Sequence, residues 1–396
     1  MGYNLSKKGL DISPSVTLEI TAKAKEMKAK GIDVISFGAG EPDFNTPENI
    51  RKEAIKAIDE GLTKYTPASG ITELKKAVCH KFKRDNNLEY EPDNIVISNG
   101  AKHSIFNALM AILNPGDEVI IGVPYWVSYP ELVKIVGGKP VYIKTVEENE
   151  FKFTVKDLES VKTKNTKAVI LNSPNNPTGS IYSRDELEEI AKWAVENNIF
   201  VISDEIYEKL VYDDEHVSIA SLNEDIKNIT IVINGMSKAY SMTGWRIGFL
   251  AANKEIAKVI SNIQSHTTSN PCSISQYASV VGLTGDQTAV IEMKKQFKKR
   301  RDYMVDAVNS ISGLSCKKPK GAFYIMVNIK ELKGKVIKGI KINSSLDLAK
   351  VLLDEGKVAV IPGVGFGDDD YFRLSYATSM ENIEEGLRRI KMVIEG

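Results

Sequence analysis

The sequence contains few cysteines. Its 396 residues include only Cys79, Cys272 and Cys316, at wide and irregular spacings. Such spacings exclude a dense disulfide framework and match no metal-binding pattern. We therefore expect buried free thiols in a reducing compartment, and we expect no metal site.

The sequence also lacks the segments that attach proteins to membranes. No apolar run approaches the roughly 18 residues that a membrane span requires, and the first residues do not form a secretory signal. The opening MGYNLS fits the myristoylation pattern, but no polybasic segment follows it as a second anchor. We expect a cytoplasmic protein without a membrane partner.

An excess of charge of either sign is absent as well. Lysine plus arginine and aspartate plus glutamate each number 52, so the formal net charge is zero. Nucleic-acid-binding domains carry a basic surface, and we expect no nucleic-acid partner here. The hydrophobic fraction of 42% is ordinary for a globular protein. Because single cores stop growing at about 250 to 300 residues, the length predicts two domains.

Seven short apolar runs alternate with helical patterns between residues 49 and 290. They predict strands at 94–98, 118–123, 140–144, 168–172, 200–204, 230–234 and 246–251. Their continuous apolar character indicates a mainly parallel α/β sheet with helices on both faces. One helix is predicted at 101–113, and another begins at the capping box of Ser183 and Glu186. The link 235–245 is too short for a crossover helix, so the last strand should run antiparallel to its predecessor.

A different pattern follows residue 289. A charged helix at 289–308 precedes strands within 322–328, 358–361 and 371–377 and helices near 345–355 and 380–394. The N-terminal helix at 17–31 has no partner of its own and should join them. We predict a large α/β domain at 49–289 and a smaller α+β domain formed by residues 1–48 and 290–396.

Polar side chains follow the predicted strands where those strands end. Lys238 lies in NGMSKAYSMTGWRIG, between two apolar runs, and Asp204 and Tyr207 follow the strand at 200–204. Asn176 lies in the turn after the strand at 168–172, and Gly100 opens the helix at 101. Because ligands bind beyond the carboxyl ends of parallel strands, we expect these side chains to meet.

Together these residues match the needs of one cofactor. A phosphate requires a helix N-terminus, a hydroxyl and an arginine; the candidates are Gly100, Ala101, Ser237 and Arg246. A protonated ring nitrogen suits the carboxylate of Asp204, and a ring oxygen suits donors such as Asn176 and Tyr207. A lysine among cations has a lowered pKa, which suits attack on a carbonyl group. Pyridoxal 5'-phosphate meets all of these demands.

Each signal has a simpler alternative. Asp204 could be a turn or capping residue, and NGAK could be only a turn. Trp126 could be a core residue, and Arg373 could be a half-exposed strand residue. Only the order of the motifs along the chain separates these readings from the cofactor hypothesis.

The motifs AGEPDF, SPNNPTG, SDEIYE, SKAYSMTGWRIG and FRLSYATS occur in this order. With them the chain resembles the class I aminotransferases over nearly its whole length, and most closely the prokaryotic-type aspartate aminotransferases. The resemblance implies the pyridoxal-phosphate-dependent transferase fold of type I, with the smaller domain closing over the active site. It also implies a homodimer with shared active sites.

The resemblance implies an aminotransferase that moves the amino group between an L-amino acid, expected to be aspartate, and 2-oxoglutarate. Lys238 would bind the cofactor covalently and move a proton, and Asp204 would keep the ring nitrogen protonated. Asn176 and Tyr207 would bind the ring oxygen, and Trp126 would stack on the ring. The phosphate side would be bound by Gly100, Ala101, Lys102, Ser237, Arg246 and Tyr65 of the neighbouring subunit.

The resemblance also implies a substrate site. Arg373 would bind the α-carboxylate beside the backbone of Gly40, with Trp126 and Asn176 next to it. Lys102 and Ser15 match the residues that hold the distal carboxylate in the aspartate enzymes.

Two positions depart from the family pattern. His103 replaces the glutamine expected after Lys102, and the segment LSKKGLDI lacks the arginine associated with prephenate use, so we do not expect that side activity.

Three other functions remain open. The chain could be an aminotransferase for aromatic amino acids or alanine, or a carbon–sulfur β-lyase on the same scaffold. A pyridoxal-phosphate-binding regulator would need an appended DNA-binding segment, which the short N-terminal extension and zero net charge do not favour.

Overall fold

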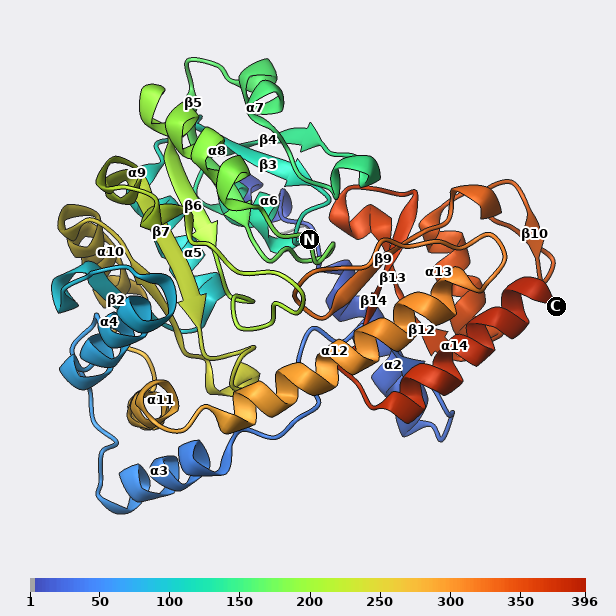
Figure 1. The fold of residues 1–396 in the computed structure, drawn as a ribbon, viewed down its shortest axis with the longest axis horizontal. Coiled ribbons are helices and arrows are strands. Elements are labelled where there is room, and N and C mark those ends of the chain that lie inside the picture. The colour runs from blue at the N-terminus through green and yellow to red at the C-terminus, as the bar shows by residue number, and fades with distance from the viewer. Residues whose placement is uncertain (1–3) are drawn as a thin grey trace.

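A seven-stranded sheet forms the larger part of the molecule (Figure 1). The computed structural model describes residues 4–396, so Gly2 of the myristoylation pattern lies outside the described residues. The strands lie in the order β2 (Ile95–Ser98), β8 (Gly248–Ala251), β7 (Thr230–Gly235), β6 (Phe200–Asp204), β5 (Thr166–Asn172), β3 (Glu118–Val123) and β4 (Lys139–Lys144). Only β8 runs antiparallel to its neighbours, β2 and β7. The predicted mainly parallel sheet and its antiparallel return are confirmed.

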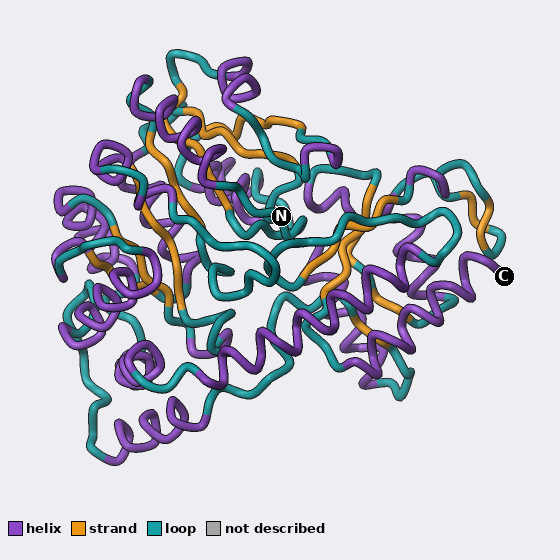
Figure 2. The backbone as a smooth tube through the Cα atoms, viewed as in Figure 1, coloured by secondary structure: helices purple, strands orange, loops and turns teal. Residues whose placement is uncertain are grey.

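Helices cover both faces of this sheet (Figure 2). Neighbouring strand residues point to opposite faces, as the pleat requires. Ile202 packs on one side with α5 (Ala101–Ile112), α6 (Ser128–Ile135) and α10 (Lys254–Thr267). Val201 packs on the other side with α8 (Arg184–Glu196), and Val232 packs there with α4 (Thr72–Asn86) and α11 (Ser273–Thr284). The remaining helices of this part are α3 (Glu48–Asp59), α7 (Val155–Val161) and α9 (Glu224–Ile229).

Local chemistry sets the limits of these elements. The hydroxyl of Ser183 accepts from the backbone of Glu186, whose carboxylate accepts from the backbone of Ser183, so the predicted capping box starts α8. The last strand begins at Gly248, two residues later than predicted. Arg246 cannot extend it, because its φ of 57° is left-handed rather than extended.

The second part of the molecule is built on small sheets. β9 (Tyr324–Asn328), β14 (Tyr371–Ser375) and β13 (Ile361–Pro362) form one antiparallel sheet, and β1 (Ile35–Ser36) pairs with β12 (Val358–Ala359). β10 (Val336–Ile337) and β11 (Ile340–Lys341) form a hairpin. Its helices are α2 (Val16–Ala29), α12 (Thr288–Asn309), α13 (Ser345–Asp354) and α14 (Met380–Glu395). The short helix α1 (Lys7–Leu10) instead contacts α6 of the larger part.

The N-terminal helix belongs with these elements, because Ala24 of α2 packs with Val34, Leu353 and Ala359. Helix α12 runs from the side of the seven-stranded sheet to the small sheets (Figure 1). The predicted domain boundary at 289/290 falls within its first turn. The division of the chain into two domains stays a prediction.

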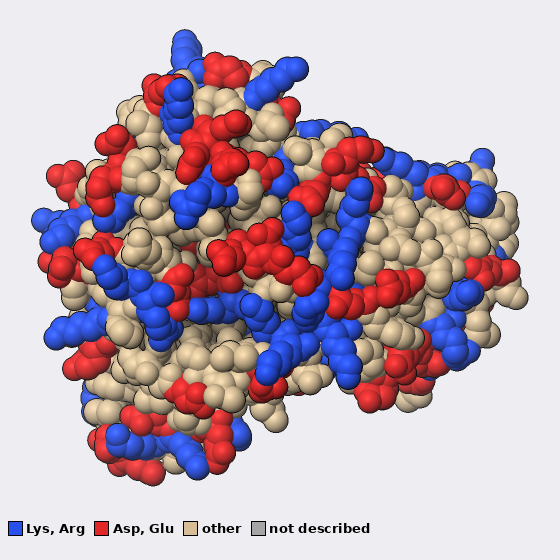
Figure 3. All heavy atoms as spheres, viewed as in Figure 1, with Lys and Arg blue, Asp and Glu red and all other residues tan. Residues whose placement is uncertain are grey.

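The surface carries both signs of charge. Lysine and arginine alternate with aspartate and glutamate over the face drawn in Figure 3, in keeping with the balanced composition. All three cysteines are free, but only Cys316 is buried. The expectation of buried thiols was wrong for Cys272, which is exposed just before α11, and for the half-buried Cys79. Between residues 4 and 396 no helix is both long and apolar enough to cross a membrane.

Strand β8 packs closely against the turn that opens α5. A Cβ atom added to Gly248 would overlap the backbone of Gly100 and Ala101. We expect Gly248→Ala to lower the free energy of unfolding by about 1 to 3 kcal/mol, because backbone on both sides must move. Gly244→Ala is the matched control, since a Cβ there meets open space. Urea denaturation measures both; equal stability of the two variants would contradict this packing.

Candidate active site

A cavity of about 670 Å³ lies beyond the carboxyl ends of β5, β6 and β7. Helix α2 and the loop at 38–43 line it from the other side. The structure brings most of the predicted site residues together here. They are Gly40, Ala101, Lys102, Trp126, Asn176, Asp204, Tyr207, Ser237, Lys238, Arg246 and Arg373.

Three predicted residues lie outside the lining of this cavity. Gly100 caps α5 directly before Ala101. Ser15 lines a neighbouring cavity of about 450 Å³, which shares Lys102 with the first. Tyr65 lines neither cavity, and it is 91% exposed. The roles predicted for the site residues remain predictions, since placement alone does not test them.

Lys238 follows β7 and points its amine into the cavity. Its ammonium donates to the backbone carbonyl of Gly40 and lies 6.0 Å from the ring centre of Tyr207. Burial lowers the pKa of Lys238 to about 8, and the charges of Arg373 and Arg246 act in the same direction. The sequence argument assigned this shift to cationic neighbours, but burial is the larger cause. A lysine in this state can supply a neutral amine near neutral pH.

Asp204 ends β6 and is 4% exposed. Its carboxylate accepts hydrogen bonds from the hydroxyl of Tyr129 at 2.7 Å and from the backbone of Ile206 at 3.2 Å. Burial raises the pKa of Asp204 to about 6, although the bond from Tyr129 opposes the rise. A cation placed beside this carboxylate would favour its ionised form.

Sequence reasoning missed Tyr129. It lies three residues after Trp126, so the two side chains leave α6 and the turn before it on the same side, and their rings meet edge to face at 5.2 Å. The i, i+3 spacing in PYWVSYP was the available signal. Tyr324 was missed as well; its hydroxyl lies 3.0 Å from the hydroxyl of Tyr207.

Arg373 is a buried cation without an anionic partner. It is 3% exposed, and its guanidinium lies 4.2 Å from the ring centre of Tyr324. It donates to Asn176 Oδ1 at 3.0 Å and to the carbonyl of Gly38 at 3.1 Å, while its Nε has no partner. No carboxylate of residues 4–396 forms an ion pair with it. The simpler alternative for Arg373, a half-exposed strand residue, is excluded, because every residue of β14 is buried.

The turn before α5 forms the opposite end of the site. Gly100 has a φ of 86°, and a Cβ there would overlap the guanidinium of Arg246. Arg246 donates to the carbonyl of Asn99 at 3.3 Å, and Nδ1 of His103 accepts from the backbone of Asn99 at 3.2 Å. His103, the departure from the family pattern, therefore braces this turn. The helix N-terminus and the arginine together suit an anion.

Lys102 lies between the two cavities. Its Nζ is 4.9 Å from the ring centre of Trp126. Partial burial lowers the pKa of Lys102, and the charge of Arg246 lowers it further. Ser15 stands at the start of α2, where its hydroxyl lies 2.9 Å from that of Thr17.

Comparisons with known proteins agree with this geometry. Residues 32–390 match the family described as aminotransferase class I and II. The chain is 52% identical to an aspartate aminotransferase of Bacillus sp. (strain YM-2) over 385 residues, which is 97% of each chain. Its fold matches an aspartate aminotransferase from Rhizobium meliloti with a TM-score of 0.96 at 44% identity, over 100% of this chain and 99% of that one. It also matches the aspartate aminotransferase from Thermus thermophilus with maleate, with a TM-score of 0.94 at 38% identity. That match covers 99% of this chain and 100% of the Thermus chain.

The lowered pKa of Lys238 predicts selective acylation. In the folded protein freed of any bound cofactor, labelling of Lys238 by acetic anhydride should reach half of its maximum near pH 8, because the neutral amine reacts. In denaturant the same residue should titrate near an ordinary value of about 10.4. Mass spectrometry of the Lys238 peptide over a pH series measures both. A midpoint above pH 10 in the folded protein would contradict the described environment.

Proposed function

The chain belongs to the class I and II aminotransferases, and we propose from this that it transfers the amino group of L-aspartate to 2-oxoglutarate with pyridoxal 5'-phosphate. The observation that carries the proposal is the buried Arg373 with no anionic partner, in the same cavity as Lys238 and Asp204. A buried unpaired cation is costly. The carboxylate of an amino acid would supply the missing charge.

The residues of the cavity fit the cofactor. The N-terminus of α5, the hydroxyl of Ser237 and the guanidinium of Arg246 would hold its phosphate. Asp204, whose pKa is raised by burial, would be held in its ionised form beside a protonated ring nitrogen. When bound, pyridoxal phosphate supplies an aldehyde for the amine and a ring that accepts electrons.

The chain's own residues supply the remaining chemistry. Lys238 would bind the cofactor covalently through its amine and then carry a proton to and from the substrate α-carbon. Asn176 and Tyr207 would donate to the ring oxygen, and Trp126 would cover one face of the ring. Arg373 would orient the substrate through its α-carboxylate, next to the backbone of Gly40.

Aspartate is favoured by a further cation that lines the cavity. Lys102 projects from the first turn of α5, where a cation is disfavoured by the helix dipole unless something anionic offsets it. A distal carboxylate would do so, with Ser15 beyond it. The relatives named above are aspartate aminotransferases, and one of them was solved with maleate, a dicarboxylate.

Assembly and domain motion are part of the proposal. A homodimer would bring Tyr65 of each subunit to the phosphate of the other, which would account for an aromatic ring that is 91% exposed. Residues 1–48 and 290–396 would close over the substrate as a smaller domain, and α2 already lines the cavity. Three free cysteines favour a cytoplasmic location.

The substrate proposal predicts the effect of Lys102→Ala. A hydrogen bond to a charged group contributes about 1.5 to 3 kcal/mol. The variant should therefore lose roughly tenfold to a hundredfold in kcat/KM for aspartate and glutamate, mainly through KM, because a remote carboxylate is bound alike in ground and transition states. Alanine and phenylalanine should be spared. With aspartate, alanine or phenylalanine as the donor, the rate is measured as glutamate formed from 2-oxoglutarate. With glutamate as the donor, it is measured as aspartate formed from oxaloacetate.

The same screen separates the alternatives. Faster reaction with phenylalanine or alanine than with aspartate in the wild type would favour those aminotransferases. Release of a 2-oxo acid from a cysteine conjugate without any acceptor would favour a carbon–sulfur β-lyase. An equal loss for all four amino acids would show that Lys102 serves the cofactor.

The assembly proposal predicts complementation between inactive chains. Lys238→Ala and Tyr65→Phe would impair different chains of one site, so mixed dimers hold one site free of both changes. Co-refolding the two variants should recover activity, up to about half of the wild-type rate per mixed dimer. Each variant refolded alone is a control, because co-refolding also forms both homodimers. Mixed dimers verified by mass spectrometry but without recovered activity would place Tyr65 in the site of its own chain.

A further inference from the structure

The segment SDEIYE, residues 203–208, sends acidic side chains in two directions. Asp204 and Tyr207 line the active-site cavity, whereas Glu205 and Glu208 are absent from its lining. Both glutamates are nevertheless buried, with exposures of 1% and 8%. The proposed function uses neither of them, so their burial needs another explanation.

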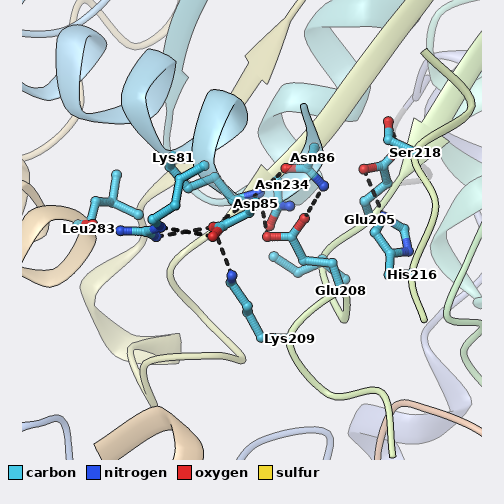
Figure 4. A network of polar contacts seen from close by, with 12 residues as sticks. Lys81, Asp85, Asn86, Glu205, Glu208, Lys209, His216, Ser218, Asn234 and Leu283 are labelled. Carbon is cyan, nitrogen blue, oxygen red and sulfur yellow. Dashed lines mark hydrogen bonds and ion pairs between the residues drawn. The ribbon is translucent and has the colours of Figure 1, made fainter. Parts of the chain in front are cut away.

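Glu208 is held by the end of helix α4 (Figure 4). The ammonium of Lys81 pairs with one carboxylate oxygen, and the amide of Asn86 donates to the other at 2.8 Å. Lys81 also donates to Asn86 Oδ1 at 2.6 Å, so the three groups close a ring. Burial alone would raise the pKa of Glu208, but the charges of Lys81, His216 and Lys209 bring it below its ordinary value. This ring of Lys81, Asn86 and Glu208 is called the α4 clamp.

Glu205 ties the same segment to its other neighbours. One carboxylate oxygen accepts from the hydroxyls of Ser203 at 2.9 Å and Ser218 at 2.7 Å. The other lies 3.0 Å from Nε2 of His216. The backbone of Glu205 donates to the carbonyl of Ile233 at 2.9 Å, which joins it to β7.

The two glutamates bracket the turn that carries Tyr207. The backbone of Glu208 donates to the carbonyl of Glu205 at 3.0 Å, and that of Leu210 donates to the carbonyl of Tyr207 at 2.8 Å. Glu208 is the next residue after Tyr207, so a shift of the glutamate must move the tyrosine. The direction in which Tyr207 enters the cavity therefore depends on contacts outside the cavity.

The same cluster could be read as a metal site. One ligand atom each from Glu205, Glu208 and His216 lie within 4.8 Å of one another. However, the ammonium of Lys81 already pairs with Glu208, and Glu205 already has two hydroxyl donors and the imidazole. The protein itself supplies the positive charge and the donors that a cation would provide.

We propose that the α4 clamp is a positioning device for the active site, which fixes the orientation of Tyr207 and the end of β6 that carries Asp204. The role rests on the proposed function, because it concerns how these residues meet the cofactor. A buried ion pair is often no more stabilising than apolar residues of similar volume. Stability and positioning can therefore be separated by experiment.

The main variant is Lys81→Met with Glu208→Leu, which removes both charges together. Asp85, which lies 4.0 Å from Lys81, keeps its pairs with Arg84 and Lys209, so no ion is left unpaired. In this variant the backbone amides at positions 208 and 210 should exchange their hydrogens about tenfold faster than in the wild type, because the turn loses the contacts that hold it. The same increase is expected with and without pyridoxal phosphate. The affinity for pyridoxal phosphate should fall. Misplacement of this kind lowers kcat by about tenfold to a hundredfold, while KM for aspartate should change little.

Two further variants make the test specific. Lys81→Met with Glu208→Gln keeps an amide that can pair with Asn86, and it should restore slow exchange and most of the affinity for pyridoxal phosphate. If the main variant fails to fold, the Gln variant still tests the proposal, because fast exchange in it would contradict the restored pairing with Asn86. Lys152→Met with Glu186→Gln removes another pair that contains a buried lysine, and it should leave exchange at the turn unchanged.

Wild-type exchange at the turn in the main variant would overturn the proposal. So would faster exchange with unchanged kcat and unchanged affinity for pyridoxal phosphate, because the turn would then be uncoupled from the site. Equal exchange in the Gln and Leu variants would overturn it as well. If the wild type transfers no amino group from any substrate, the proposed function fails, but exchange and cofactor affinity still decide whether the clamp positions the turn.

Discussion

More basic than acidic side chains line the cavity: Lys25, Lys28, Lys102, Lys238, Arg246 and Arg373 against Glu41, Asp43 and Asp204. Of these three carboxyl groups only Asp204 is buried, and burial raises its pKa to about 6. Placing uncompensated charge in a protein interior is costly, and nothing in hydrophobic packing repays it. The arrangement becomes favourable when anionic groups enter, and a phosphate at one end and a carboxylate at the other would each meet a guanidinium. The mainly parallel sheet matters because it delivers Lys238 and Asp204 to one edge, where a single ligand can touch both.

Those parts of the fold that depend on local pattern could be predicted from the sequence. The runs at 118–123 and 200–204 are strands with those bounds, because continuously apolar segments of this length have few other uses in a globular chain. The meeting of Lys238, Asp204 and Asn176 followed from the rule for strand ends. The order of the motifs along the chain indicated the protein family, which the individual residues could not establish.

Other features of the site depend on contacts between segments that are distant in the sequence, and no local sequence pattern predicts such contacts. Tyr129 and Asp204 form a hydrogen bond although they lie 75 positions apart in the sequence, and Asn86 and Glu208 do so at a separation of 122 positions. Lys81 reads as an ordinary helical lysine until the helix is packed on the sheet. The residues around Arg373 left its burial open for the same reason, since a strand residue between Phe372 and Leu374 could equally face solvent. The exposed Cys272 shows the reverse error, because residue type alone does not fix exposure.

The strand order also affects the sequence of events during synthesis. β2, the earliest strand of the seven-stranded sheet in chain order, has only β8 as a neighbour in that sheet, and the chain must reach Ala251 before that neighbour exists. The turn after β2 forms one end of the active site, while Arg373 at the other end is made only after every strand of the seven-stranded sheet. Chains fold from the N-terminus as they emerge from the ribosome. A nascent chain therefore passes through a long interval with an unpaired strand edge and no complete ligand site, so the ligand can stabilise the finished chain but cannot guide the early stages of its folding.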